Sequence, residues 1–328
     1  MAEDLVQQRS KYSLDRLTQF REGIASFATP TQLDGLTIFA AGSFARLEAS
    51  EYSDIDLWFT YHKSGRGIET RKSGEKEMFR QIVELAASMG FPAFSGGGRY
   101  LQTHNTDDIV QFLGGPTDDA SNHFTSRMML LLESKPVYGD DEYDLVVREM
   151  IRPYYTDFHN HKDLFQPWYL MNDIMRYWKT LLLNYENTRR NNGAEAEEQR
   201  VKNFKLKFSR MTTCFATIAA LGSFQTAVTQ EIVESIVKLT PRERLAVVAQ
   251  NVPTAHVQID SVLEDYVWFL QLTGKSKPAL HAHFEDKEGK RTMFDRANNY
   301  GGKMFDLLAR IDKENYPKDS GLLRFLVV

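Results

Sequence analysis

Apolar residues recur at intervals of three and four along the first part of the chain, and this spacing gives way in places to short apolar runs. The helical spacing predicts amphipathic helices over residues 12–27 and 75–89. The runs at 36–41 and 55–61 are apolar and partly β-branched, which is typical of buried strands. A third strand is predicted over residues 99–103, after a glycine-rich turn. The first part of the chain therefore alternates helices with strands.

The rest of the chain shows helical spacing almost throughout. Helices are predicted over residues 107–113, 124–133, 142–151, 168–185, 202–221, 229–238, 241–251, 259–273 and 292–313. The polar segment 189–199 is predicted to be a loop, and Pro153 marks a domain boundary. We therefore expect an α/β (α+β) fold, with a small mixed-sheet domain over residues 1–150 and an all-helical domain over residues 151–328.

The second predicted strand carries two acids on one face. Side chains alternate along a strand, so Asp54, Asp56 and Trp58 share one face while Ile55 and Leu57 share the other. Two carboxylates at this spacing lie roughly 7 Å apart along the strand. Such a pair suits Mg²⁺, which binds proteins through one or two carboxylates together with substrate phosphates.

The first predicted strand runs directly into Gly42 and Ser43. Glycine lets the main chain approach a phosphate closely, and the N–H groups at the start of a helix bind anions. The Gly-Ser turn and the Asp-x-Asp strand together predict a site for a nucleoside triphosphate held by Mg²⁺ or Mn²⁺. The alternative interpretation is a tight turn followed by a strand with two solvent-facing acids.

The order of these parts resembles the signature of the DNA polymerase β-like nucleotidyltransferases: an apolar strand, Gly-Ser, a spacer and then Asp-x-Asp. The string GSFARLEASEYSDIDL at residues 42–57 is similar to the version in protein PII uridylyltransferases and in signalling nucleotidyltransferases related to them. The segment 126–140 also resembles this group, and the segments 172–180 and 204–211 resemble it more loosely.

The resemblance implies that Asp54 and Asp56 are the catalytic residues and hold two Mg²⁺ ions, while Gly42 and Ser43 hold the β- and γ-phosphates. An acceptor hydroxyl would attack the α-phosphorus of a nucleoside triphosphate such as ATP, and pyrophosphate would leave. The helical domain would close the nucleotide cleft. The acceptor stays open between a protein side chain, a second nucleotide, an RNA end and a small molecule.

The same family supplies a third carboxylate from a later strand. The predicted strand at 99–103 contains no acid, and Asp107 and Asp108 follow it. Either acid could serve if the strand is longer, or both could begin a helix whose dipole they complement. The missing acid keeps a second function open, a regulatory nucleotide-binding module with weak or no catalysis. A helical interaction protein without a nucleotide site is the third possibility.

Basic residues in the helical half are candidates for contact with the triphosphate. They are Arg200, Lys202, Lys205, Lys207 and Arg210. We expect Lys205 and Lys207 to bind the nucleotide, and a solvated helix face is the alternative. Arg176 and Lys179 are similar candidates on another helix.

Composition and charge narrow the classes of partner and of protein that remain possible. A net charge of −4 gives no global positive field, so nucleic acid is a less favoured partner. The single cysteine, Cys214, excludes an internal disulfide and lies in an apolar run typical of a buried thiol. The chain has no uninterrupted apolar stretch of about 18 residues, so we expect no membrane span and a cytoplasmic protein. The pairs His159/His161 and His281/His283 are expected to be solvent-exposed rather than metal ligands.

Overall fold

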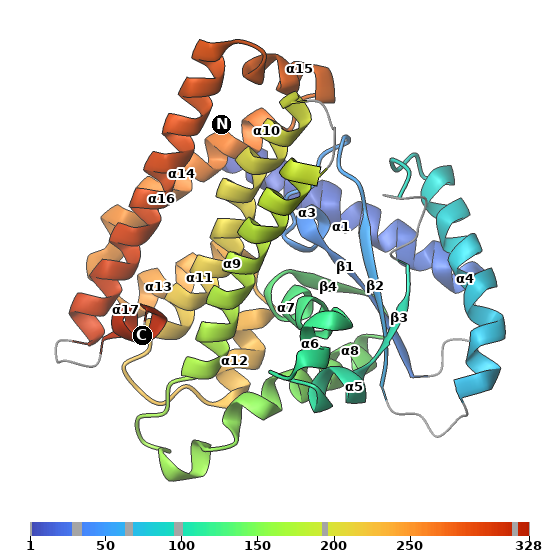
Figure 1. Ribbon diagram of the computed structural model, residues 1–328, viewed down its shortest axis with the longest axis horizontal. Helices are drawn as coiled ribbons and strands as arrows, with labels where there is room; N and C mark the ends of the chain where they lie inside the picture. The colour runs from blue at the N-terminus through green and yellow to red at the C-terminus, as the bar shows by residue number, and fades with distance from the viewer. Residues whose placement is uncertain are drawn as a thin grey trace. The chain divides into compact units, whose positions relative to one another are not determined.

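The computed structural model describes residues 2–27, 35–62, 68–94, 101–191, 196–316 and 321–327. The chain divides into two compact units, Met1–Pro153 and Tyr154–Val328 (Figure 1). The first unit combines helices with a four-stranded mixed sheet and is therefore α+β. The regular elements described in the second unit are all helices.

The sheet of the first unit has two central strands and two edge strands. Its strands are β1 (Leu36–Ala41), β2 (Asp56–Tyr61), β3 (Thr103–Asn105) and β4 (Ser134–Tyr138), in the order β3-β2-β1-β4. The helices are α1 (Ala2–Phe27), α3 (Gly42–Ala45), α4 (Ile68–Ser88), α5 (Thr106–Gln111), α6 (Pro116–Ala120), α7 (His123–Leu132) and α8 (Asp140–Ile151). Strand β1 is antiparallel to β2 and β4, whereas β2 and β3 are parallel.

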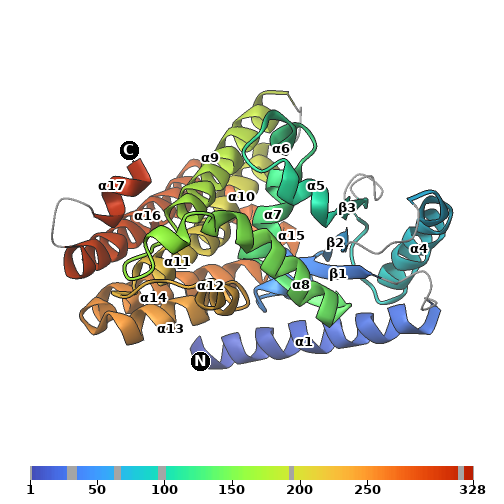
Figure 2. The ribbon, with the colours of Figure 1, turned by 90° about the horizontal axis from the view of Figure 1, so that it is seen from below.

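One face of this sheet forms the main core of the unit with α1 and α4, and Figure 2 shows α1 running along the sheet. The buried side chains that meet there include Leu17, Phe20, Ile24, Leu36, Ile38, Ala40, Ile55, Leu57, Phe59, Met78, Ile82 and Ala86. The strand residues among them alternate in sequence, as the hydrophobic pattern predicts. The remaining positions of β1 and β2 therefore face the other side of the sheet.

Helices α7 and α8 contact that other face through β1. The ring of Phe39 lies 6.4 Å from the ring of Tyr143, which belongs to α8. The hydroxyl of Tyr143 is also 2.8 Å from that of Ser134, at the start of β4. The first unit thus has helices on both faces of its sheet, while Asp56 at the start of β2 stays exposed.

Two strands differ from the sequence prediction. Strand β3 lies at Thr103–Asn105, and residues 101–102 of the predicted strand are not part of it. Residues 99–100 of that prediction and the predicted turn at 96–98 lie outside the described residues. Strand β4 is not predicted at all, because its sequence SKPVY includes a lysine and a proline. An edge strand tolerates Pro136, since the missing N–H can be at a position that faces solvent.

The second unit is built from long helices joined by short turns. They are α9 (Trp168–Asn191), α10 (Ala196–Lys205), the π-helical turn η4 (Leu206–Arg210), α11 (Met211–Gly222), α12 (Gln230–Val237), α13 (Pro241–Asn251), α14 (His256–Thr273), α15 (Lys277–His281), α16 (Lys287–Asn315) and α17 (Leu322–Val327). Short 3₁₀ turns are η2 (Arg152–Tyr155), η3 (Phe158–Asn160), η5 (Pro253–Ala255) and η6 (Ala282–Phe284). The predicted loop at 189–199 is wrong at both ends, because α9 continues to Asn191 and α10 begins at Ala196; residues 192–195 lie outside the described residues.

Helix α11 forms the centre of this unit and contacts α9, α13 and α16. Cys214 lies on it and is fully buried, as the sequence predicts, and burial raises the pKa of its thiol to about 12. Tyr177 and Trp178 on α9 are also buried and pack the core. None of the helices in the described part of the chain is long and apolar enough to cross a membrane.

Candidate functional site

The Gly-Ser turn connects β1 to the short helix α3. Gly42 has φ +67°, a left-handed conformation that glycine adopts without steric cost. The turn is closed by backbone hydrogen bonds from Arg46 N–H to Gly42 O (3.1 Å) and from Glu48 N–H to Ser43 O (2.9 Å). Ser43 is half-buried at the start of this four-residue helix. The turn is therefore tightly ordered, as a phosphate-binding turn would need to be.

The residue after the helical turn is also unusual. Leu47 has φ 58°, a conformation that side-chain-bearing residues seldom adopt. Positions of this kind persist where surrounding contacts enforce them, and they cluster at functional sites. Two left-handed residues thus lie at the ends of this turn: Gly42 is the first residue of α3, and Leu47 follows shortly after its last residue.

Asp54 and Asp56 are both exposed, whereas Ile55 and Leu57 between and after them are buried. The predicted alternation is therefore present, although Asp54 precedes β2 and Asp56 is its first residue. The antiparallel register places Asp56 opposite Ala41, the residue just before Gly42. Strand pairing thus brings one acid of the Asp-x-Asp pair directly beside the Gly-Ser turn.

The contact between Gly42 and Asp56 is close. A Cβ atom built on Gly42 would lie 2.9 Å from Oδ2 of Asp56, closer than side-chain carbons normally approach another atom. Only glycine leaves room for the carboxylate in this position. Gly42 and Asp56 therefore lie together for two reasons. The strand register brings them to the same place, and the missing side chain at Gly42 leaves room for the Asp56 carboxylate.

The spacer between the two halves of the motif is fixed by its serines and by α1. Ser50 N–H donates to the Ser53 hydroxyl (3.0 Å), and Ser53 N–H donates back to Ser50 O (2.9 Å). Ala49 N–H donates to the hydroxyl of Ser13 on α1 (3.1 Å). These bonds hold the segment that delivers Asp54 and Asp56 to the start of β2.

A buried ion cluster supports the same segment. Arg46 donates from Nε to Glu48 (2.8 Å) and from Nη1 to Glu133, and all three side chains are buried. Glu133 lies between α7 and β4, so the cluster ties the end of α3 to the beginning of β4. The spacing of residues in the sequence does not predict this cluster. The available signal is a glutamate placed directly after the apolar run MMLLL.

The third acid is not supplied by Asp107 or Asp108. Both lie in the first turn of α5, and the Asn105 side chain accepts a hydrogen bond from Asp107 N–H. The hydroxyl of Thr106 donates to Tyr61 O (2.8 Å), which fixes this turn at the end of β2. Asp56 begins that strand, so roughly 16 Å of strand separates the two ends. The alternative of helix-start acids describes these residues correctly.

Trp58 lies on the same face of β2 as Asp56 and contacts strand β3. The rings of Trp58 and His104 are stacked with centroids 5.4 Å apart. His104 is buried, and desolvation together with the neighbouring His123 lowers the pKa of its imidazole to about 4. His104 is therefore neutral near pH 7. It pairs with Thr60, toward the end of β2 that lies away from Asp56.

The basic run lies in the second unit, and most of it has partners there. Arg200 donates to Glu197 and to Phe284 O, and Lys202 pairs with Glu198. Lys207 donates to the Asn298 side chain (2.9 Å) and lies within the π-helical turn η4, whereas Lys205 is exposed. Arg176 pairs with Asp173, and Lys179 is exposed. The assignment of Lys205 and Lys207 to nucleotide binding stays a prediction.

The carboxylates at the start of β2 are the kind of ligand that a magnesium ion binds. Two exposed carboxylates, Asp54 and Asp56, leave coordination positions for phosphate oxygens and water, as Mg²⁺ requires. Within the described residues, no group of three or more His, Cys, Asp or Glu side chains is arranged to hold a metal. A metal at this site would therefore depend on its substrate for part of its coordination.

Comparison with known proteins adds no family assignment. No protein-family model matches the chain, and no curated protein matches it.

Proposed function

We propose that the chain is a metal-dependent nucleotidyltransferase, which moves a nucleoside monophosphate from a nucleoside triphosphate to an acceptor hydroxyl and releases pyrophosphate. The observation that carries this proposal is the close approach of the Asp56 carboxylate to Gly42. It supports a single site made from both halves of the motif that resembles the DNA polymerase β-like enzymes. The two exposed acids and the ordered turn are what such a site requires.

The roles of the residues follow from their chemistry. Asp54 and Asp56 hold Mg²⁺ or Mn²⁺, which when bound supplies positive charge to the triphosphate. The absence of a side chain at Gly42 leaves room for the Asp56 carboxylate beside the turn, and Ser43 donates a hydrogen bond to a phosphate oxygen. The protein's contribution is positioning and electrostatic complementarity. The acceptor is a hydroxyl whose identity is open.

A regulatory nucleotide-binding module is the second candidate. Two observations favour it: Asp107 and Asp108 lie at the far end of β2, and the described residues contain no three-acid group. Such a module would bind the triphosphate through the same turn and acids without turning it over at a useful rate.

The two candidates separate in one experiment. The protein is incubated with each α-labelled nucleoside triphosphate and Mg²⁺ or Mn²⁺, in the presence of a cell extract as a source of acceptors, and labelled product and pyrophosphate are measured. For the transferase we expect labelled product, and we expect Asp54→Asn with Asp56→Asn to abolish it while circular dichroism stays unchanged. Both acids are exposed, so the double variant should fold.

Metal-dependent triphosphate binding without product in any extract would support the regulatory module and contradict the transferase. Product formation by the double variant would contradict the assignment of Asp54 and Asp56 as catalytic residues and as metal ligands. A chain that binds no triphosphate with either metal would favour the third possibility, a helical interaction protein.

A further inference from the structure

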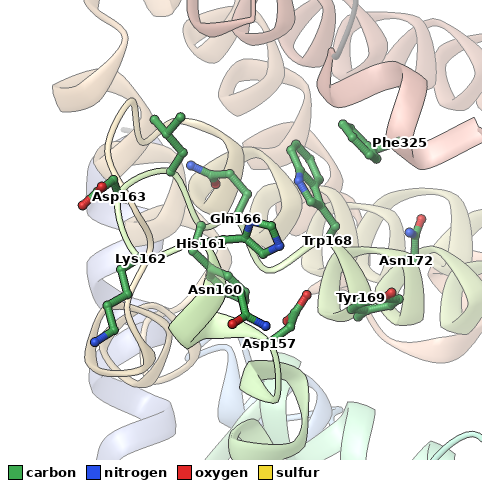
Figure 3. Close-up of a pocket in the computed structure, with 12 residues that line it drawn as sticks. Asp157, Asn160, His161, Lys162, Asp163, Gln166, Trp168, Tyr169, Asn172 and Phe325 are labelled. Carbon is green, nitrogen blue, oxygen red and sulfur yellow. The ribbon is translucent and has the colours of Figure 1, made fainter.

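The second unit contains a hollow of about 620 Å³ that none of the motif residues touches. Its walls come from the segment 157–166, the first turns of α9 and Phe325 on α17 (Figure 3). This volume lies within the range of about 300–1,000 Å³ that is usual for small-molecule sites.

The segment that forms one wall is firmly anchored. Tyr155 Oη donates to Val228 O (3.0 Å), and the Gln166 side chain donates to Thr226 O (3.1 Å). The ring of Phe165 packs against those of Tyr155 and Phe158, with centroids 4.9 and 5.1 Å apart. The hollow is therefore formed before any ligand arrives, which lowers the entropic cost of binding.

Trp168 is fixed in the wall by two aromatic neighbours. Its ring stacks on Phe325 with centroids 4.3 Å apart and planes 16° apart, and it packs obliquely against Tyr316 at 5.7 Å. Figure 3 shows Trp168 and His161 facing the same space. No acceptor for the indole N–H lies among the residues that the structure describes. Phe325 covers one face of the Trp168 ring, and the N–H at the ring edge is the group that Trp168 can offer to a ligand.

Tyr169 supplies the aromatic surface that Trp168 lacks. It lies on the same turn of α9, lines the hollow and is 69% exposed. Within the described part of the chain its ring packs against no other aromatic ring. An open phenol at the rim of a preformed hollow is a stacking platform for a flat ligand.

The remaining polar groups match a neutral ligand with several donors and acceptors. Asp157, Asn160 and Asn172 line the hollow with a carboxylate and two amides. Lys162 offsets one of the two carboxylates, Asp157 and Asp163, so the lining has a small net negative charge and does not favour an anionic ligand. Asparagine and aspartate side chains form paired hydrogen bonds with the edges of nucleobases, which also stack on tyrosine.

We propose that this hollow binds a neutral nucleobase or nucleoside. Stacking on Tyr169, a hydrogen bond from the Trp168 N–H and polar contacts with Asp157 and the two asparagines recognise the base. This site is separate from the acids and the Gly-Ser turn of the proposed transferase and does not depend on that function.

The test uses the full chain with free adenosine, guanosine, cytidine and uridine, without Mg²⁺ and without phosphates. Isothermal titration calorimetry and tryptophan fluorescence measure binding. We expect saturable binding of at least one nucleoside, weakened by Tyr169→Ala by about fivefold to a hundredfold. Asp157→Asn should weaken it as well or change which base is preferred. Phe305→Ala, which removes a ring that is 58% exposed on α16, is the matched control and should change nothing.

The proposal is overturned if no nucleoside shows saturable binding up to about 1 mM. It is also overturned if binding persists unchanged in both Tyr169→Ala and Asp157→Asn, or if glucose binds with the same dependence on Tyr169 while nucleosides do not. The Asp54→Asn, Asp56→Asn double variant should keep nucleoside binding. Loss of binding in that variant would place the ligand in the first unit and contradict the proposal. Because Tyr169 is exposed, its replacement should leave the circular dichroism spectrum unchanged.

Discussion

The carboxylate of Asp56 occupies the space into which a side chain at Gly42 would point, with Oδ2 only 2.9 Å from the position of a Cβ atom. Eleven residues of turn and spacer separate Gly42 from Asp54 along the chain. The antiparallel pairing of Ala41 with Asp56 is what brings the glycine and the second acid together. A change at Gly42 should therefore act through Asp56.

Gly42→Ala should weaken metal-dependent nucleotide binding by more than its effect on stability explains. A left-handed alanine costs about 1–2 kcal/mol of folding free energy, and the new Cβ also displaces the Asp56 carboxylate. Urea denaturation and calorimetry with Mg²⁺ and a nucleoside triphosphate measure the two effects.

Gly90→Ala provides the control for that variant. Gly90 also has a left-handed φ of +76°, but a Cβ there would meet no atom within 4 Å. It should lose a similar amount of stability and keep full nucleotide affinity. Equal losses of affinity in the two variants would mean that strain alone, and not the position of Asp56, determines binding.

Replacing Arg46 should destabilise the first unit strongly. Arg46→Met removes the arginine that pairs with the buried Glu48 and Glu133, and breaking a buried pair in this way costs about 3–5 kcal/mol. Urea denaturation measures the loss. Arg80→Met removes an exposed arginine that pairs with Glu77 and Glu84 on α4, so its effect should be much smaller. Similar losses in both variants would contradict a structural role for the buried cluster.

His104 should make stability fall with acid. Burial lowers its pKa to about 4 in the folded chain from an ordinary value of 6.5, so the unfolded chain binds more protons between these values. The stabilisation by the neutral ring is present above about pH 6.5 and is lost as the pH falls toward 4, with a size of about 3 kcal/mol.

His104→Phe tests this dependence, because phenylalanine keeps a ring to stack on Trp58 and cannot be protonated. The unfolding free energy of the variant, measured by urea denaturation from pH 7 to pH 4, should fall less steeply than that of the unaltered protein. Identical slopes would show that other groups cause the acid sensitivity.

Lys205 and Lys207, in the helical unit, are predicted to contact the phosphates of the nucleotide. Lys205→Met with Lys207→Met should weaken triphosphate binding by at least about tenfold, since hydrogen bonds to charged groups are the stronger ones. Calorimetry with Mg²⁺ and the triphosphate measures the change. Lys202→Met removes a neighbouring lysine that pairs with Glu198 and should have little effect. Unchanged affinity in the double variant would assign the basic run to a solvated helix face.

Local signals in the sequence determined a large part of the fold. The apolar run of β1 and the helix α13 have the predicted bounds, and the Thr240 side chain with Glu243 forms a capping box at the start of α13, before Pro241 in its first turn. The alternation around Asp54 and Asp56 was also visible, because side chains on a strand point to opposite faces regardless of what packs on them.

The tertiary structure decided the features that depend on residues far apart in the chain. Strand β4 forms because β1 offers a free edge, and its own sequence does not favour a strand. The cluster of Arg46, Glu48 and Glu133 joins residues up to 87 positions apart, so no local pattern encodes it. The sequence determined which groups are available, namely the Gly-Ser turn and the two acids. Pairing between strands, which no single segment specifies, decided that Asp56 lies against Gly42 and that Asp107 and Asp108 lie at the opposite end of the strand.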